Sequence, residues 1–301
     1  MSGMGKSIDD SHRSVVSRAL EWLTPVWIVA SIVAIAWQVS KHWGEIISQP
    51  LRLDLLSISL IATLGAKFFS ALQVRRSLRQ SGAEVPEKAS FYAYSMADLA
   101  KYLPGGIWGF VGRIALYRKL RLDRACITRS LIIEQVWLIG GSIAIGCLLL
   151  AVTDVAWQFR AAAIAPAIAW IVALVVTRRF ATAATGSSVK LIELLFLQAG
   201  LWGLAAVGFG VLLPYDVLKS GAAFSLAFAA GLMVPFAPSG IGVRELVVGT
   251  LLTPSIPLGD VVRALILSRA VWIVADLLFA LVVLLSCQKS WAEQVEVTTP
   301  R

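Results

Sequence analysis

The sequence predicts an all-α polytopic membrane protein made of two inverted repeats, each with three transmembrane helices and one re-entrant helical hairpin. Three observations predict this fold class. The chain is 58% hydrophobic and 15% charged, which exceeds the apolar share of ordinary soluble domains. Its apolar residues form runs long enough to cross a bilayer. Two similar helix-breaking stretches interrupt those runs 134 positions apart.

The helix-breaking stretches define the repeat. The first is KYLPGGIWGFVGR at residues 101–113, and the second is VPFAPSGIGVRE at residues 234–245. A shift of 134 places Pro104 on Pro238 and Gly106 on Gly240. Proline and glycine both interrupt helices, so each stretch is expected to form the tip of a hairpin between two short helices.

The two repeats follow from this alignment. A polar tail at residues 1–19 precedes the first repeat at 20–152, and the second repeat covers 153–288 before a cytoplasmic tail at 289–301. The hairpins are expected at 89–117 and 221–252, because the segment 89–103 is too short to cross about 30 Å of hydrocarbon at about 1.5 Å per residue. We expect a loop at 178–189 and disorder at 290–301. The complete spans are predicted at 20–40, 53–74, 129–151, 161–177, 190–213 and 261–287.

The distribution of positive charge favours re-entry over a complete crossing by each hairpin. Re-entry puts sixteen Lys and Arg residues on one side of the membrane and four on the other. The positive-inside rule assigns the richer side to the cytoplasm, with both termini there and the protein in the cell membrane. Three spans per half is an odd number, so the second half is inverted relative to the first, as in many transporters.

Composition also excludes several functions. The net charge of +9 indicates loops facing anionic lipid, because a nucleic-acid partner would need a soluble basic domain. Two His and three scattered Cys, Cys126, Cys147 and Cys287, have no metal-ligand spacing. We therefore expect no metal, no disulfide and no cofactor.

The hairpin tips are the predicted binding site. Their glycines precede short helices whose free N–H groups can receive an anion such as a phosphate, and Arg113 and Arg244 follow about two turns later with planar guanidinium forks. The alternative is that Pro and Gly only permit close helix packing while the arginines snorkel to the interface. The predicted substrate-binding residues are Gly105, Gly106, Trp108, Arg113, Glu134, Ser239, Gly240, Arg244, Glu245 and Arg269.

Other ionisable residues within apolar segments are functional candidates by default. Glu134 and Arg269 lie at comparable depths on repeat-related spans, which predicts a central Glu134–Arg269 pair with either a functional or a structural role. Asp98 and Lys101 have the i, i+3 spacing of a local salt bridge. Lys67, a buried-looking cation, and Glu193 are expected in the cytoplasmic halves or at the ends of their spans, where they contact lipid heads or substrate. Trp108 is expected to act as a gate or to contact lipid chains.

The motifs resemble the transmembrane region of the lysylphosphatidylglycerol synthetase/flippase family. The resemblance covers about residues 15–288 and rests on YLPGG through Arg113, on Glu134 after a basic loop, and on PSGIGVRE at 238–245. Family members often carry Pro-Gly-Arg-x-Gly-Glu in the first half. Here Gly106 replaces the arginine and no glutamate follows Gly109.

The resemblance implies a flippase-like transporter that moves or binds a phosphate-bearing lipid or lipid-linked substrate between the hairpins. The alternative is a membrane enzyme or enzyme subunit acting on a polyprenyl-phosphate or other lipid-linked precursor. We expect no lysyl transfer, since the soluble transferase domain of full-length relatives has no counterpart in the sequence and no catalytic constellation stands out. Expected partners are membrane lipids and the anionic or lipid-linked substrate, with a second copy, a synthase or a glycosyltransferase left open.

Re-entry makes a topology prediction. In a background without native cysteines, single cysteines beside Arg79 and beside Arg121 are expected to react with an impermeant maleimide from the same side of the membrane, because the first hairpin returns to the side from which it entered. Labelling of the two positions from opposite sides would show that the hairpin crosses.

Overall fold

The computed structural model describes residues 50–102, 108–153, 157–185, 189–234, 237 and 240–298, together with 37, 40 and 44. The predicted first span at 20–40 and the tip residues Pro104, Gly105, Gly106, Pro238 and Ser239 therefore fall outside the description, apart from single positions. Within it every element is a helix, which confirms the all-α prediction. The helices are α3 (Leu53–Gln80), α4 (Glu87–Leu99), the 3-10 turn η1 (Ala100–Tyr102), α5 (Trp108–Lys119), α6 (Arg124–Ala151), α7 (Trp157–Thr185), α8 (Leu191–Gly210), α9 (Val217–Met233), α10 (Val243–Leu252) and α11 (Leu258–Thr298).

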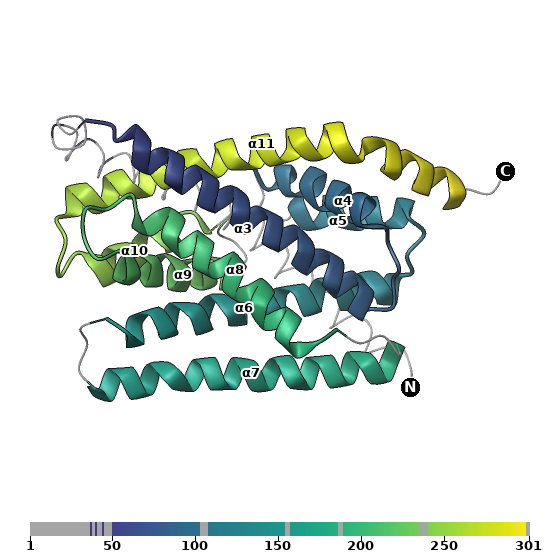
Figure 1. Ribbon diagram of the computed structural model, residues 1–301, viewed down its shortest axis with the longest axis horizontal. Helices are drawn as coiled ribbons and strands as arrows, with labels where there is room; N and C mark the ends of the chain where they lie inside the picture. The colour runs from purple at the N-terminus through teal and green to yellow at the C-terminus, as the bar shows by residue number, and fades with distance from the viewer. Residues whose placement is uncertain are drawn as a thin grey trace, which may run out of the picture.

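Four of these helices, α3, α6, α8 and α11, are long and apolar enough to cross a membrane. They coincide with the spans predicted at 53–74, 129–151, 190–213 and 261–287. Helix α7 has 29 residues, contains the predicted span 161–177 and packs along α6. Helices α6, α7 and α11 run along the long axis of the molecule, and α3 and α8 cross it obliquely (Figure 1). The described chain thus has the architecture of a helical membrane protein.

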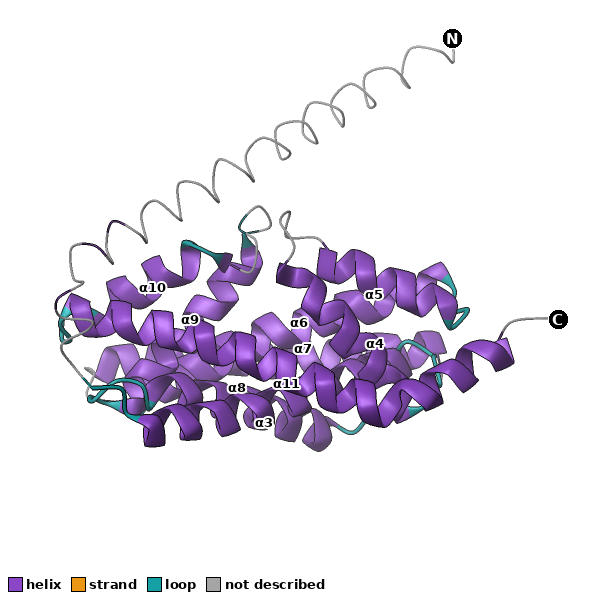
Figure 2. Cartoon of the chain, turned by 90° about the horizontal axis from the view of Figure 1, so that it is seen from above, coloured by secondary structure: helices purple, strands orange, loops and turns teal. Residues whose placement is uncertain are grey.

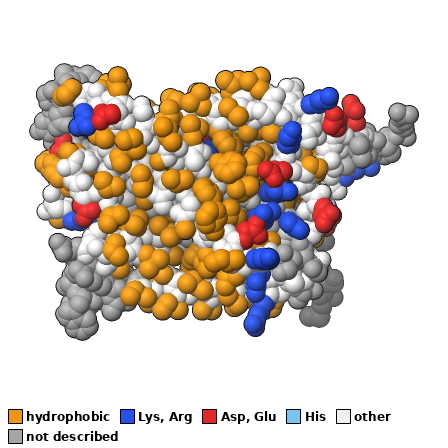
Figure 3. Space-filling model, viewed as in Figure 1, with side chains coloured by type: hydrophobic (Ala, Val, Ile, Leu, Met, Phe, Trp, Pro, Cys, Tyr) orange, Lys and Arg blue, Asp and Glu red, His pale blue; other side chains and the backbone are white. Residues whose placement is uncertain are grey.

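The surface is apolar along the middle and charged at the ends. Exposed side chains include Leu285 on α11 and Ile168 on α7, which are 77% and 57% accessible. Apolar side chains cover the middle of one face, and charged ones gather beyond it (Figure 3). We call the end where α3 and α7 finish the basic end; its described cations are Arg75, Arg76, Arg79, Lys88, Arg118, Lys119, Arg121, Arg124, Arg129, Arg178, Arg179, Lys190 and Lys289.

Two pairs of short helices lie at opposite ends of the long axis (Figures 1 and 2). Helices α4 and α5 pack together toward the basic end, and α9 and α10 pack together toward the other. With 13 and 10 residues, α4 and α10 reach only about 20 and 15 Å at about 1.5 Å per residue. The 41-residue helix α11 contacts a helix of each pair and so connects the two ends.

Helix α7 continues past the predicted start of the 178–189 loop and ends at Thr185. The side chain of Gln80, the last residue of α3, explains part of this extension. Its Nε2 donates to the carbonyl oxygen of Arg178 at 3.3 Å and to Oγ1 of Thr182 at 3.2 Å, and its Oε1 accepts from the backbone N–H of Val189 at 3.1 Å. These bonds tie the last turns of α7 to α3, so the sequence-based loop boundary was wrong.

The disorder predicted for 290–301 is wrong at least through Thr298, because α11 continues to that residue. No Pro or Gly interrupts residues 288–298, so the helix has no local reason to stop. Trp291 anchors the extension: it is 8% exposed and stacks on Tyr92 of α4 with 5.0 Å between ring centroids. The tail therefore packs against α4 of the first short helix pair.

The Trp291 contact can be tested by substitution. Trp291→Ala is expected to lower the free energy of unfolding by about 3 kcal/mol, since it removes a buried indole and leaves a cavity against Tyr92. Thermal unfolding in detergent measures the effect, with the exposed neighbour Glu293→Ala as the control. Equal unfolding temperatures for the two variants would contradict the packed position of the tail.

Candidate functional site

The first short helix pair contributes a buried ion pair. Arg113 of α5 donates from Nη1 to both carboxylate oxygens of Glu134 on α6, and the two side chains are only 9% and 7% exposed. The ring of Tyr94 lies 5.4 Å from the guanidinium carbon. Gln73 donates from Nε2 to the backbone oxygen of Glu134 at 3.3 Å. An unpaired charge here would be costly, so the pair fixes α5 to α6.

The second short helix pair contributes the corresponding contact with its charges reversed. Glu245 of α10 accepts at Oε1 from Nε and Nη2 of Arg269 on α11, at 3.1 and 2.6 Å. Its Oε2 accepts from the backbone N–H of Gly242 at 2.8 Å. One carboxylate therefore caps the first turn of α10 and joins it to α11.

The predicted central Glu134–Arg269 pair is not formed. Each residue instead pairs within its own half of the chain, Glu134 with Arg113 and Arg269 with Glu245. The reason is proximity, because each short helix brings a charge of the required sign against the adjacent long helix. In the first half the arginine is on the short helix, and in the second half the glutamate is.

Arg244 differs from these residues because it has no carboxylate partner. No hydrogen bond or ion pair joins it to any residue that the structure describes, and its Nε is buried. The guanidinium carbon instead lies 3.7 Å from the ring centroid of Phe228. A Cβ added to Gly231 or Gly240 would come within 2.9 or 2.8 Å of the Arg244 Nε. The two glycines thus form a slot that holds Arg244 against the ring.

Gly240 is the one residue of the second tip's Pro-Ser-Gly segment that the structure describes. Its φ is +69°, a left-handed conformation that favours glycine. Its backbone also approaches Gly231 closely, since a Cβ on Gly240 would lie 2.8 Å from the Gly231 Cα. A side chain at either position would therefore displace the chain or Arg244.

A second charge cluster lies where η1 meets α3 and α11. The carboxylate of Asp276 is 2.5 Å from Nζ of Lys67 and 2.6 Å from Nζ of Lys101, and it accepts a 2.5 Å hydrogen bond from the hydroxyl of Tyr102. Asp98 also pairs with both lysines, at 3.0 Å from Lys101. The i, i+3 Asp98–Lys101 salt bridge predicted from the sequence is confirmed, but it is part of a larger network.

Lys67 was predicted to be a buried cation in the cytoplasmic half or at the end of its span, in contact with lipid heads or substrate. Its burial is confirmed, and the contact with lipid heads is wrong. Lys67 lies in the middle of α3 with a side chain 5% exposed and paired with two aspartates. Glu193 is close to the basic end as predicted, where it pairs with Arg76. Lys67 can remain charged in the interior of the protein because α4 and α11 each supply a carboxylate, from Asp98 and Asp276.

Aromatic rings join the charged groups of both halves. Lys67 lies 5.3 Å from the ring of Tyr94, which also faces Arg113, and 5.9 Å from the ring of Trp272. The ring of Trp272 is 6.1 Å from that of Phe228, against which Arg244 stacks. The resulting series of contacts runs in the order Arg113, Tyr94, Lys67, Trp272, Phe228 and Arg244.

The charges of this interior do not cancel. Among the residues that the structure describes, it holds one more basic than acidic side chain, and the cation that no described carboxylate pairs with is Arg244. An extra positive charge among apolar side chains is stabilised by an anion. The nine residues counted are Lys67, Lys101, Arg113, Arg244 and Arg269 against Asp98, Glu134, Glu245 and Asp276.

The predicted site is thus brought together in part. Arg244, Glu245, Arg269 and Gly240 form one group around α10, and Arg113 and Glu134 form another around α5. Trp108 begins α5 and is 43% exposed, while Gly105, Gly106 and Ser239 lie outside the described residues. Sequence reasoning missed Tyr94, Phe228 and Gly231, because aromatic and glycine residues are common in membrane helices and nothing local marked these three. Tyr102 belonged to the YLPGG motif, but its contact with Asp276 was not predicted.

The described residues contain no group of three or more His, Cys, Asp or Glu side chains that could hold a metal ion. No protein-family model matches the chain, and no curated protein sequence matches it.

The buried Arg113–Glu134 pair leads to a stability prediction. Glu134→Gln leaves the Arg113 charge buried without its partner and is expected to cost about 3–5 kcal/mol of unfolding free energy. The double variant Arg113→Gln/Glu134→Gln removes both charges and is expected to recover part of this loss, as measured by thermal unfolding in detergent. A double variant as unstable as the sum of the single variants would show that the two side chains do not interact.

Proposed function

We propose that the protein is a flippase-like membrane transporter that binds a phosphate-bearing lipid or lipid-linked substrate, with Arg244 as the main anion-binding residue. The observation that carries this proposal is the unpaired guanidinium. Arg244 is the charged side chain of the interior that no described carboxylate neutralises, and its slot between Gly231 and Gly240 holds it beside the second tip. A phosphate is a suitable partner for a planar guanidinium fork.

Arg269 is the second residue expected to contact the substrate. Its side chain is 33% exposed although it pairs with Glu245, so part of its guanidinium remains accessible. A phosphate on Arg244 can share it, since arginine has five N–H donors and Glu245 takes two of them. Glu245 then positions Arg269 and caps α10, while a cationic group of a substrate can approach the same carboxylate.

Arg113 is less accessible to a substrate than Arg269. Glu134 occupies its Nη1, and the pair is more buried than Arg269 and Glu245. We propose that Arg113 joins substrate binding only when the Arg113–Glu134 pair separates. The first half also departs from the family pattern at Gly106, which agrees with a smaller role for that half.

The membrane arrangement belongs to the same proposal. We infer two inverted repeats whose hairpins α4–α5 and α9–α10 re-enter from opposite sides, with the basic end in the cytoplasm. The opposite placement of the two short pairs and the gathering of cations at one end support this inference. The resemblance of PSGIGVRE and of YLPGG through Arg113 to the lysylphosphatidylglycerol synthetase/flippase family supports a lipid as the cargo.

Lipid movement in reconstituted vesicles tests the proposal. The wild-type chain is expected to move fluorophore-labelled phosphatidylglycerol between leaflets faster than labelled phosphatidylcholine. Arg244→Gln is expected to slow the anionic lipid by about tenfold or more, because it removes hydrogen bonds from a charged donor worth about 1.5–3 kcal/mol. Dithionite bleaching of the outer leaflet measures the rate.

Two further variants separate position from charge. Gly231→Ala keeps every charge but displaces Arg244, so it is expected to slow transport as well, whereas the exposed Arg118→Gln at the basic end is expected to transport at the wild-type rate. Wild-type rates for folded Arg244→Gln would overturn the assignment. Turnover of a lipid-linked precursor without movement between leaflets would favour the membrane-enzyme alternative.

A further inference from the structure

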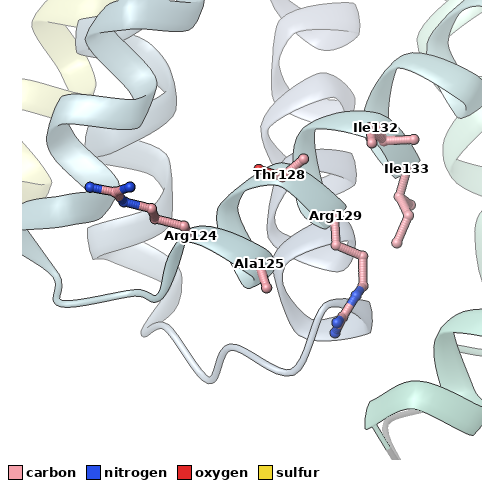
Figure 4. Close-up of a pocket in the computed structure, with 6 residues that line it drawn as sticks. All are labelled: Arg124, Ala125, Thr128, Arg129, Ile132 and Ile133. Atoms are coloured by element: carbon pink, nitrogen blue, oxygen red, sulfur yellow. The ribbon is translucent and has the colours of Figure 1, made fainter. Parts of the chain in front are cut away.

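A groove at the basic end lies apart from the interior charges. It has a volume of about 480 Å³ and is lined by Arg124, Ala125, Thr128, Arg129, Ile132 and Ile133, all from the first turns of α6 (Figure 4). None of these residues belongs to the charge network that includes Arg244. The groove therefore needs its own explanation.

The lining residues form two rows along α6, because residues four apart lie on the same face of a helix. One row is Arg124, Thr128 and Ile132, and the other begins at Ala125 and continues to Arg129 and Ile133. The first row thus changes from polar to apolar over eight residues, or about 12 Å of helix, whereas the second has its one charged residue, Arg129, between Ala125 and Ile133. A phospholipid has the order of the first row, with its phosphate at the membrane surface and its acyl chains below.

The polar groups of the groove have unused donors. The structure describes no hydrogen bond or ion pair for the exposed side chain of Arg124, nor one for the hydroxyl of Thr128. Arg129 uses one N–H, from Nη1 to the carbonyl oxygen of Ser81 at 3.2 Å, out of the five that arginine carries. By contrast, Arg75 and Arg76 at the same end are already paired with glutamates.

The backbone N–H groups at the start of α6 are not the anion-binding donors of this groove. Asp123 precedes α6, and its Oδ1 accepts a hydrogen bond from the backbone N–H of Cys126 at 3.3 Å. That carboxylate occupies the position in which an anion would meet the free N–H groups. The two guanidinium groups and the hydroxyl are the donors that remain.

We propose that this groove is a binding site for an anionic phospholipid, separate from the transport site. Arg129 and Thr128 bind the phosphate together with Arg124, whose exposed side chain points away from Arg129 in Figure 4 and has to turn toward it. An acyl chain lies along Ile132, which is 59% exposed. Charge complementarity selects an anionic over a zwitterionic head group, as in other basic pockets on membrane helices. The exposed apolar end of the first row, Ile132, selects a lipid over free phosphate. This inference does not depend on the proposed transport activity.

Lipid-dependent stability of the full chain in detergent tests the site. Dioleoyl phosphatidylglycerol is expected to raise the unfolding temperature of the wild type, while equal concentrations of dioleoyl phosphatidylcholine or inorganic phosphate are not. Arg124→Gln/Arg129→Gln is expected to weaken the apparent affinity for phosphatidylglycerol by about tenfold or more, the factor for loss of charged hydrogen bonds. Native mass spectrometry should show the matching loss of retained lipid.

Three variants make the result specific. Arg79→Gln/Arg118→Gln removes two exposed positive charges from the same end and is expected to keep the wild-type affinity. Ile132→Glu places a carboxylate in the exposed apolar part of the groove and is expected to reduce the lipid effect as the double variant does. In an Arg244→Gln background, which removes binding at the proposed transport site, Arg124→Gln/Arg129→Gln is still expected to weaken the remaining lipid effect.

Unchanged lipid binding by folded Arg124→Gln/Arg129→Gln would overturn the proposal. An equal loss of phosphatidylglycerol affinity in Arg79→Gln/Arg118→Gln would also overturn it, because the lipid would then be attracted by the total charge of the basic end and not by the groove. If lipid binding is lost only in Arg244→Gln, the bound lipid lies in the interior site. If inorganic phosphate stabilises the protein as much as the lipid does, the acyl chain makes no contact that matters.

Discussion

The cost of burying charge in an apolar interior governs how the helices of this protein pack. Asp276 is an example, because its side chain is only 1% exposed and its charge is stabilised by two lysines and a tyrosine hydroxyl. Those partners come from α3 and η1, so the carboxylate on α11 holds both elements at a fixed depth. Removing any one charge leaves another uncompensated, and the helices are therefore coupled through electrostatics as well as through packing.

Helix α11 has the central place in this arrangement. Arg269 and Asp276 are seven residues apart, about 10 Å along the axis, and they face different short helix pairs. Arg269 contacts α10 through Glu245, whereas Asp276 contacts η1 after α4. A movement of α11 would change both contacts together. The structure thus provides a physical connection between the two halves of the proposed transport site.

The two anion sites that we propose use arginine in different ways. Arg244 is held without a carboxylate between two glycines and a ring, so its position is fixed before any anion arrives. Arg124 is exposed and long, so it can adapt to a lipid head group at the surface. A fixed cation suits selection of a cargo, whereas an adaptable one suits a resident lipid that varies with the membrane.

The sequence by itself determined the helical class and four long apolar spans, and it marked Arg244, Glu245 and Arg269 as candidate site residues, because hydropathy, helix breakers and intramembrane charges are local signals. It also determined the Asp98–Lys101 contact, which follows from helical spacing. Only the tertiary structure decided that Glu134 pairs with Arg113, that Lys67 meets Asp276, and that Gly231 and Phe228 enclose Arg244. Those contacts join residues 13 to 209 positions apart, and ion pairing in a low-dielectric interior depends on distances of a few ångströms that no sequence pattern specifies.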